Sequence, residues 1–286
     1  MSDQIAMNLK ILERKAFDMR NEDIYHYFLQ LFQEFDDKSS FEPFIFSYEN
    51  KNSMLYDFKI KYALNNIASY GSDIDKSICL MRWVHHALPS GKNAVHLMGC
   101  SPDEILSVNN KVVNCCNHAV VLNAALLSMG LHSRCVWCKS LDVSNLEYHV
   151  VNVVYISKYS KWIMLDSANQ AVWYDKNGIP LGLMEIRRSL ADNDPVKIGN
   201  GEIEWGGRYV SVRRNKYIAY MKKNCFRFSC YLKSTYLQEE ETSLVELVPK
   251  GYYPSEGCRK KVRNGRILTC RYTTNPNEFW QKPMVG

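Results

Sequence analysis

The sequence predicts an α+β fold, in which helices come first and an antiparallel sheet follows one long apolar helix. Apolar residues recur at helical spacing up to Gly130, and their period changes to two after it. The composition, 46% hydrophobic and 23% charged, excludes a disordered chain or a fibrous repeat. We expect N-terminal helices packed on the core (1–74), the core itself (75–195) and a basic mixed α/β extension (196–286) that does not fold independently.

Three helices are expected before the apolar one, over residues 3–36, 54–70 and 75–88. The first combines two runs of apolar residues at helical spacing. The third has a start signal, because Ser72 and the aspartates beside it are capping residues. It also has an end signal, because the Pro-Ser-Gly sequence at 89–91 does not continue a helix.

A fourth helix is expected over residues 114–129, and it presents a cysteine at its start. Asn114 is a capping residue, Cys115 stands at or near the first helical position, and Gly130 ends the helix. The unpaired N–H groups of a helix start favour negative charge, so a thiolate at Cys115 is stabilised and becomes a better nucleophile. The helix is apolar enough to be buried, which aims its first turn rigidly.

Short strands are expected over 134–139, 148–156, 161–166 and 171–174. The second and third form a hairpin that turns near 157–160. With Val154 opposite Lys161, the antiparallel register sets His149 opposite Asp166 on one face, about 5 Å apart. Asp166 then accepts a hydrogen bond from one ring nitrogen of His149, and the other nitrogen faces the cysteine of the fourth helix. A nucleophile, a base and a group that orients the base make a catalytic triad for thiol chemistry.

The last ninety residues mix strand-like runs, 209–212 and 267–272, with one helix around 217–223. From Val196 to Gly286 there are 17 Lys and Arg against 8 Asp and Glu, so this region is strongly basic. We interpret the charge as a solvated face because the basic residues are scattered among apolar ones. A nucleic-acid binder that uses this region is the alternative.

The residues around the predicted triad follow one another in a fixed order and spacing: Cys115, Ala119, Ala124, Gly130, Arg134, His149 opening an apolar strand, and Trp162 to Asp166. This set resembles the transglutaminase-like superfamily over about residues 75–170, including the helix that contains Trp83. The resemblance implies a papain-like core in which the nucleophile-bearing helix packs on an antiparallel sheet. It carries the family's catalytic Cys, His and Asp onto Cys115, His149 and Asp166. The sequence departs from the family at Val113, where glycine is common, and this substitution would reshape the substrate groove or the oxyanion site.

The resemblance also implies the chemistry. A Cys115 thiolate attacks the carbonyl of an amide or peptide and forms an acyl-thioester, which water or an amine then resolves. The expected substrate is a peptide, a protein or a small amide, with a possible amine co-substrate. The backbone N–H of Cys115 is one donor to the oxyanion, and Trp83 or Asn114 is a candidate for the second.

Other interpretations of the cysteines and histidines stay open. Cys116 is the rival nucleophile, although the spacing to Ala119 and Gly130 favours Cys115. His118 is expected to be structural or to line the substrate site. A zinc site is not expected, because Cys135 and Cys138 would face opposite sides of a strand. No cofactor is expected, and a binding or scaffold protein that keeps the fold without turnover is the remaining alternative.

The ten cysteines are expected to be thiols in a reducing compartment. The sequence has no apolar run of about 18 residues and no secretory signal at its start. We therefore expect a cytoplasmic protein that does not cross a membrane.

Overall fold

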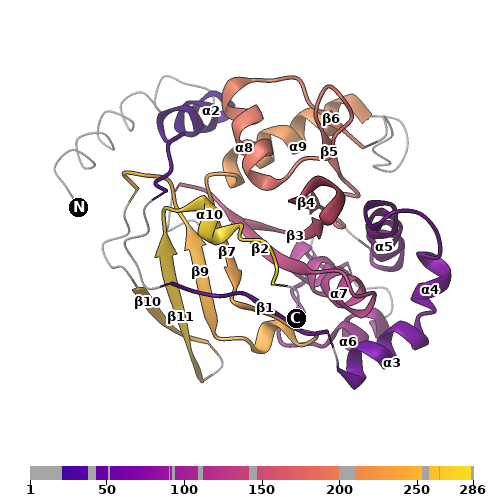
Figure 1. Cartoon of the computed structure of the whole chain (residues 1–286). Coiled ribbons are helices and arrows are strands. Elements are labelled where there is room, and N and C mark those ends of the chain that lie inside the picture. The colour runs from indigo at the N-terminus through magenta and orange to yellow at the C-terminus, as the bar shows by residue number, and fades with distance from the viewer. Residues whose placement is uncertain are drawn as a thin grey trace.

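A computed structural model describes residues 21–37, 43–50, 52–89, 91, 94–108, 112–141, 147–199, 210–252, 258–263 and 265–284. Its centre is a seven-stranded sheet that has helices on both faces (Figure 1). The predicted α+β class is confirmed. The apolar run before residue 21, which was expected to be helical, lies outside the described residues.

The sheet has the strand order β10-β11-β9-β7-β2-β3-β4. Its strands are β2 (Ser133–Lys139), β3 (Tyr148–Ile156), β4 (Lys161–Leu165), β7 (Arg227–Tyr231), β9 (Ser243–Leu247), β10 (Cys258–Arg263) and β11 (Arg266–Thr273). All neighbours are antiparallel except β11 and β9. Strands from the basic C-terminal region thus continue the sheet of the core, while the boundary at 195 stays a prediction.

Two pairs of two-residue strands lie outside this sheet. They are β1 (Ser47–Tyr48) with β8 (Lys233–Ser234), and β5 (Trp173–Tyr174) with β6 (Lys197–Ile198). Two short 3₁₀ helices, η1 (Ser157–Tyr159) and η2 (Gln238–Glu240), complete the connections. No helix in the described part of the chain is long and apolar enough to cross a membrane.

The helices form two groups (Figure 1). The first group is α3 (Ser53–Lys61), α4 (Leu64–Ile67), α5 (Asp73–Ala87), α6 (Pro102–Ser107) and α7 (Cys115–Ser128). The second group is α2 (Asn21–Leu31), α8 (Leu183–Asp192) and α9 (Val210–Asn224), and the short α10 (Pro276–Phe279) lies near the C-terminus. Alternate residues of β3 belong to different apolar clusters: Val150 and Val154 pack with the first group, and Val151 and Val153 with the second.

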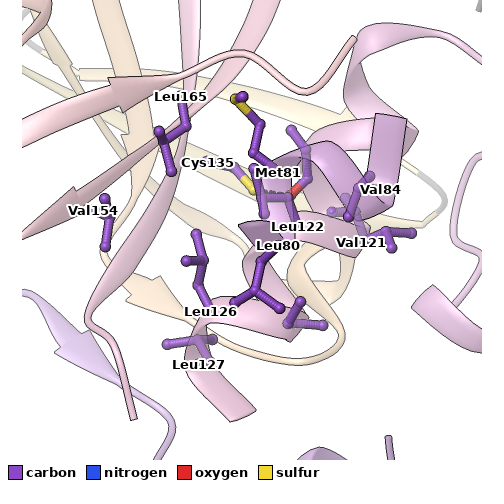
Figure 2. Packing of buried hydrophobic residues seen from close by; sticks show 14 of the residues in the cluster. Leu80, Met81, Val84, Val121, Leu122, Leu126, Leu127, Cys135, Val154 and Leu165 are labelled. Carbon is purple, nitrogen blue, oxygen red and sulfur yellow. Dashed lines mark hydrogen bonds between the residues drawn. The ribbon is translucent and has the colours of Figure 1, made fainter. Parts of the chain in front are cut away.

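Helix α7 lies in the middle of the first cluster. Leu122 and Leu126 of α7 lie among Leu80 of α5, Val154 of β3 and Leu165 of β4 (Figure 2). The helix is buried from its second residue to its last turn, which is why its sequence is mostly apolar around its whole circumference, with Asn117, His118 and Asn123 as buried polar exceptions. A helix held this firmly by packing has a fixed first turn.

Both end signals of α7 act as the sequence predicts. The Asn114 side-chain oxygen accepts hydrogen bonds from the N–H groups of Cys116 and Asn117, at 3.1 and 3.2 Å. Gly130 follows the helix with φ 77°, in the left-handed region that suits glycine. The predicted capping by Ser72 at the start of α5 is also present, as a capping box with Asp75.

A buried arginine connects β2 to the C-terminal end of the chain. The guanidinium of Arg134 lies over the rings of Phe46 and Trp162, 4.1 and 4.0 Å from their centroids. Its Nη1 donates a hydrogen bond to the carbonyl of Phe279 at 2.8 Å. Stacking and this hydrogen bond compensate for removing the cation from water.

Two predicted elements differ in kind or in number in the structure, and the first helix, expected to reach residue 36, ends at Leu31. The single helix expected over 54–70 is two helices, α3 and α4, because Ala63 adopts a left-handed conformation with φ 49° and turns the chain. The strand expected over 209–212 is wrong from Val210 onward, where α9 begins. Its valines favour strands by propensity, but the helix is retained because Tyr217 and Met221, four residues apart, are both buried in the second cluster.

Candidate functional site

The start of α7 is fixed by the segment before it. Asn114 N–H donates a hydrogen bond to the carbonyl of Val95 at 3.0 Å, and Val113 N–H donates to that of Pro89 at 3.1 Å. Leu97 exchanges hydrogen bonds of 3.0 and 3.1 Å with the side chain of Asn117. The first turn of α7 is thus held from outside as well as by its own packing.

Cys115 is the first residue of α7 and is half-buried. Its Sγ accepts a hydrogen bond from the Val150 N–H at 3.4 Å, which places the sulfur against the start of β3. The thiol is also within hydrogen-bonding reach of the His149 ring. The structure therefore brings the predicted nucleophile to the predicted base.

His149 and Asp166 form a buried pair. Nε2 of His149 lies 2.5 Å from Oδ2 of Asp166, and neither side chain is more than 3% exposed. Because Nε2 faces the carboxylate, Nδ1 is the ring nitrogen left for Cys115. All three predicted site residues thus meet at one place, where α7 abuts the β3–β4 hairpin.

The register that predicted this contact is wrong by two residues. Lys161 lies opposite Ile156 rather than Val154, because the connection is a tight turn of η1 followed by Ser160 in the left-handed region with φ 50°. Asp166 consequently lies just beyond β4 and meets the histidine diagonally. The contact survives because a shift of two residues keeps every side chain on its face of the sheet.

Four hydrogen bonds converge on the Asp166 carboxylate. Besides His149, Asn169 donates its backbone N–H to Oδ1 at 3.0 Å and its Nδ2 to Oδ2 at 2.8 Å. Tyr217 of α9 donates its hydroxyl to Oδ2 at 2.7 Å. Asn169 has a sequence signal, since an Asp often accepts from the backbone three residues on in a tight turn. No comparable signal links Tyr217 to the site.

Electrostatics favours the charged forms of this pair. Burial alone lowers the pKa of His149, but the Asp166 carboxylate and the adjacent Cys115 outweigh it and raise that pKa well above its ordinary value. Burial alone raises the pKa of Asp166, but His149, Asn169 and Tyr217 hold it below its ordinary value. The histidine and aspartate therefore form an imidazolium–carboxylate ion pair inside the protein.

Helix α9 supplies an aromatic wall to the site. The ring of Tyr220 meets the ring of His149 edge to face, with 5.3 Å between centroids. Its hydroxyl donates to the carbonyl of Tyr148 at 3.3 Å, and burial raises its pKa. Neither tyrosine of α9 was predicted as a site residue, because the partners of both lie far back in the chain.

Two further histidines lie near the pair. His85 of α5 contacts the carbonyl of Ser167 through Nδ1 at 2.9 Å, so it reaches the residue after Asp166. His118 is fully buried on α7, one turn after Cys115. Burial, reinforced by the proximity of His85, lowers the pKa of His118 to about 4, so it is neutral at physiological pH.

The other candidate residues point into the apolar core or pack against other aromatic rings. Cys116 is buried in the first cluster, and so is the Val113 side chain, which therefore points into the core. The ring of Trp83 packs against Phe58 and Tyr62, 6.3 and 5.6 Å between centroids. A role for Trp83 as an oxyanion donor stays a prediction.

The expected opposition of Cys135 and Cys138 is also observed. Cys135 belongs to the first apolar cluster and Cys138 to the second, on opposite faces of β2. Within the described ranges, no three His, Cys, Asp or Glu side chains are grouped so that they could hold a metal ion.

Comparison with known proteins finds a similarity to one family in part of the chain. No curated protein matches the sequence. Among solved structures, one described as "a Putative Cysteine Protease from Cytophaga hutchinsonii" is similar at 12% identity with a TM-score of 0.32. That similarity covers 53% of this chain and 55% of the other, so the chain matches about half the length of that structure. Residues 61–167, which contain Cys115, His149 and Asp166, match the model of the transglutaminase-like superfamily. This match confirms the resemblance to the transglutaminase-like superfamily predicted from the sequence.

Proposed function

We propose that the protein is a cysteine enzyme that cleaves or exchanges an amide or peptide bond through an acyl-thioester on Cys115. The observation that carries the proposal is the position of His149, whose ring contacts the Cys115 thiol on one side and the Asp166 carboxylate on the other. A buried imidazolium beside a thiol stabilises the thiolate, which is the nucleophilic form. The family match of residues 61–167 supports the same chemistry.

The first half of the reaction forms the thioester. The Cys115 thiolate attacks the substrate carbonyl carbon, and the carbonyl electrons move onto oxygen. The backbone N–H of Cys115, which as the first of helix α7 needs no partner within the helix, is our candidate donor to that oxyanion. Collapse of the intermediate breaks the C–N bond, and the His149 imidazolium gives its proton to the departing amine or ammonia.

The second half releases the acyl group. Neutral His149 takes a proton from water or from an amine, which attacks the thioester carbonyl. The product is a carboxylic acid in the first case and a new amide in the second, and the Cys115 thiolate is regenerated beside the imidazolium. Asp166 holds the ring in the orientation that both steps need.

An activated ester tests this chemistry without knowledge of the natural substrate. p-Nitrophenyl acetate should transfer one acetyl group to Cys115, detected by intact mass and peptide mapping. His149→Ala should slow acetylation strongly, and Cys115→Ser should abolish it at this position. Cys116→Ser is the matched control, because Cys116 is the neighbouring thiol and is buried in the core. This variant should be acetylated at Cys115 like the wild type.

Two outcomes would count against the enzyme. Slow acetylation spread over several thiols, unaffected by His149→Ala, would support a binding or scaffold protein that keeps the fold. A salt-dependent mobility shift with nucleic acid, in the absence of acetylation, would support the nucleic-acid alternative. If acetyl-Cys115 forms, adding methylamine distinguishes the two second steps, since N-methylacetamide marks transfer to an amine and acetate alone marks hydrolysis.

A further inference from the structure

Tyr217 touches the proposed triad from outside the segment that matches the family. It lies on α9, fifty residues beyond the end of that segment, and is almost completely buried. Its hydroxyl donates to Asp166 Oδ2 at 2.7 Å. The same oxygen faces His149 Nε2 at 2.5 Å and accepts from Asn169 Nδ2 at 2.8 Å.

The direction of the Tyr217 hydrogen bond is fixed by its surroundings. An ionised carboxylate can only accept, so the phenol must supply the proton. The indole Nε1 of Trp173 lies 3.5 Å from the phenol oxygen and can only donate to it. Trp173 therefore occupies a lone pair of the phenol oxygen and leaves its proton for Asp166.

Three donors on one carboxylate oxygen compete for the same electron density. A carboxylate oxygen offers about two lone-pair directions, so each added donor weakens its attraction for the others. The Tyr217 hydroxyl thus draws charge away from the contact between Asp166 and His149. Without it, Asp166 would stabilise the imidazolium form of His149 more strongly.

We propose that Tyr217 is a positioning residue of the triad, which fixes Asp166 Oδ2 and limits how strongly this carboxylate stabilises the imidazolium form of His149. The inference rests on the proposed function, in which the His149 imidazolium must release its Nδ1 proton, on the Cys115 side, to the leaving group. An imidazolium that is stabilised too strongly is a poor acid. By weakening this stabilisation, the Tyr217 phenol makes His149 a better proton donor to the leaving group. The site is then completed by the region after residue 195 and is not contained in the family segment alone.

Other ionisable groups face this cluster and remain in place when Tyr217 is changed. They are Cys115 and His118 of α7, His85 of α5, Cys138 of β2, Glu147 before β3, Tyr220 of α9 and Cys225 directly after α9. A matched variant can therefore separate the Tyr217 hydroxyl from this common background.

The test measures how Cys115 reacts with iodoacetate as the pH is varied. The imidazolium attracts this anionic reagent, so the rate of alkylation falls at alkaline pH as His149 loses its proton. This alkaline limb of the rate–pH profile therefore reports the protonation of His149. In Tyr217→Phe the limb should move to higher pH by about half a unit. In Tyr252→Phe, which removes a tyrosine hydroxyl that donates to the carbonyl of Leu141 at 2.8 Å rather than to Asp166, the limb should stay at the wild-type pH.

A second replacement covers the case in which Tyr217→Phe does not fold. 3-Fluorotyrosine at position 217 keeps the phenol hydroxyl and makes it a stronger hydrogen-bond donor to Asp166, so the alkaline limb should move to lower pH. A limb that is unchanged in these replacements, or that moves the other way, overturns the role of Tyr217. If wild-type Cys115 shows no selective reaction at all, the proposed function fails instead, and the two failures are distinguishable.

Discussion

Replacing Asp166 by asparagine removes the charge that the buried imidazole faces and keeps the size of the side chain. Removing one partner of a buried ion pair costs about 3–5 kcal/mol. Asparagine still offers an oxygen to Tyr217, and His149 can lose its proton in the variant. We therefore expect the free energy of unfolding to fall by about 2–3 kcal/mol near neutral pH.

The pH dependence of this loss follows from the two shifted pKa values. The raised pKa of His149 gives stability that is fully present below its unfolded value of about 6.5 and is lost as the pH rises toward the folded value. The lowered pKa of Asp166 gives stability that is present above its unfolded value of about 3.9 and is lost as the pH falls. The gap between wild type and Asp166→Asn should thus be largest between about pH 4 and 6.5.

Urea unfolding of both proteins at a series of pH values, from about 5 to about 9, measures this gap directly. The free energy of unfolding should fall with urea concentration at the same slope in both proteins, since the fold is unchanged. A gap that stays constant across the series would refute the buried ion pair. So would an asparagine variant as stable as the wild type at about pH 6.

Three further changes have expected outcomes. Cys115→Ser should abolish acetylation at this position and leave the melting temperature close to native; a Ser variant with comparable activity would contradict the nucleophile. Wild type should lose up to about 3 kcal/mol as the pH falls from about 6.5 to 4, because the unfolded chain protonates His118 and the folded one resists it. His118→Asn should flatten this loss in urea titrations, and an equal slope in the two proteins would contradict it. Arg134→Lys should cost about 2–4 kcal/mol in urea unfolding, because a lysine cannot both stack on Trp162 and keep the hydrogen bond to Phe279; unchanged stability would count against the stacking.

The features of the site that depend on local chemistry could be predicted from the sequence. Asn114 and Gly130 mark the ends of α7 because capping and left-handed φ depend on single residues. The face shared by His149 and Asp166 follows from the period of two in strands. These local rules suffice to bring three distant residues together.

The features that depend on tertiary context could not be predicted. The register of the hairpin depends on the left-handed conformation of Ser160, which a serine adopts only when the turn requires it. Tyr217 meets Asp166 across 51 residues, and its helix begins in valines that favour a strand. Burial of α9 against α8 and the sheet outweighs the strand preference of its valines, and a short stretch of sequence gives no sign of such burial.

The central claim is that the reactivity of Cys115 depends on the ring of His149. The most direct test is the rate of carboxymethylation of Cys115 by iodoacetate, mapped by mass spectrometry against the other thiols of the folded protein. We predict that Cys115 dominates near neutral pH and that His149→Ala removes this dominance while the fold persists. Equal rates at Cys115 in the two proteins would contradict the claim.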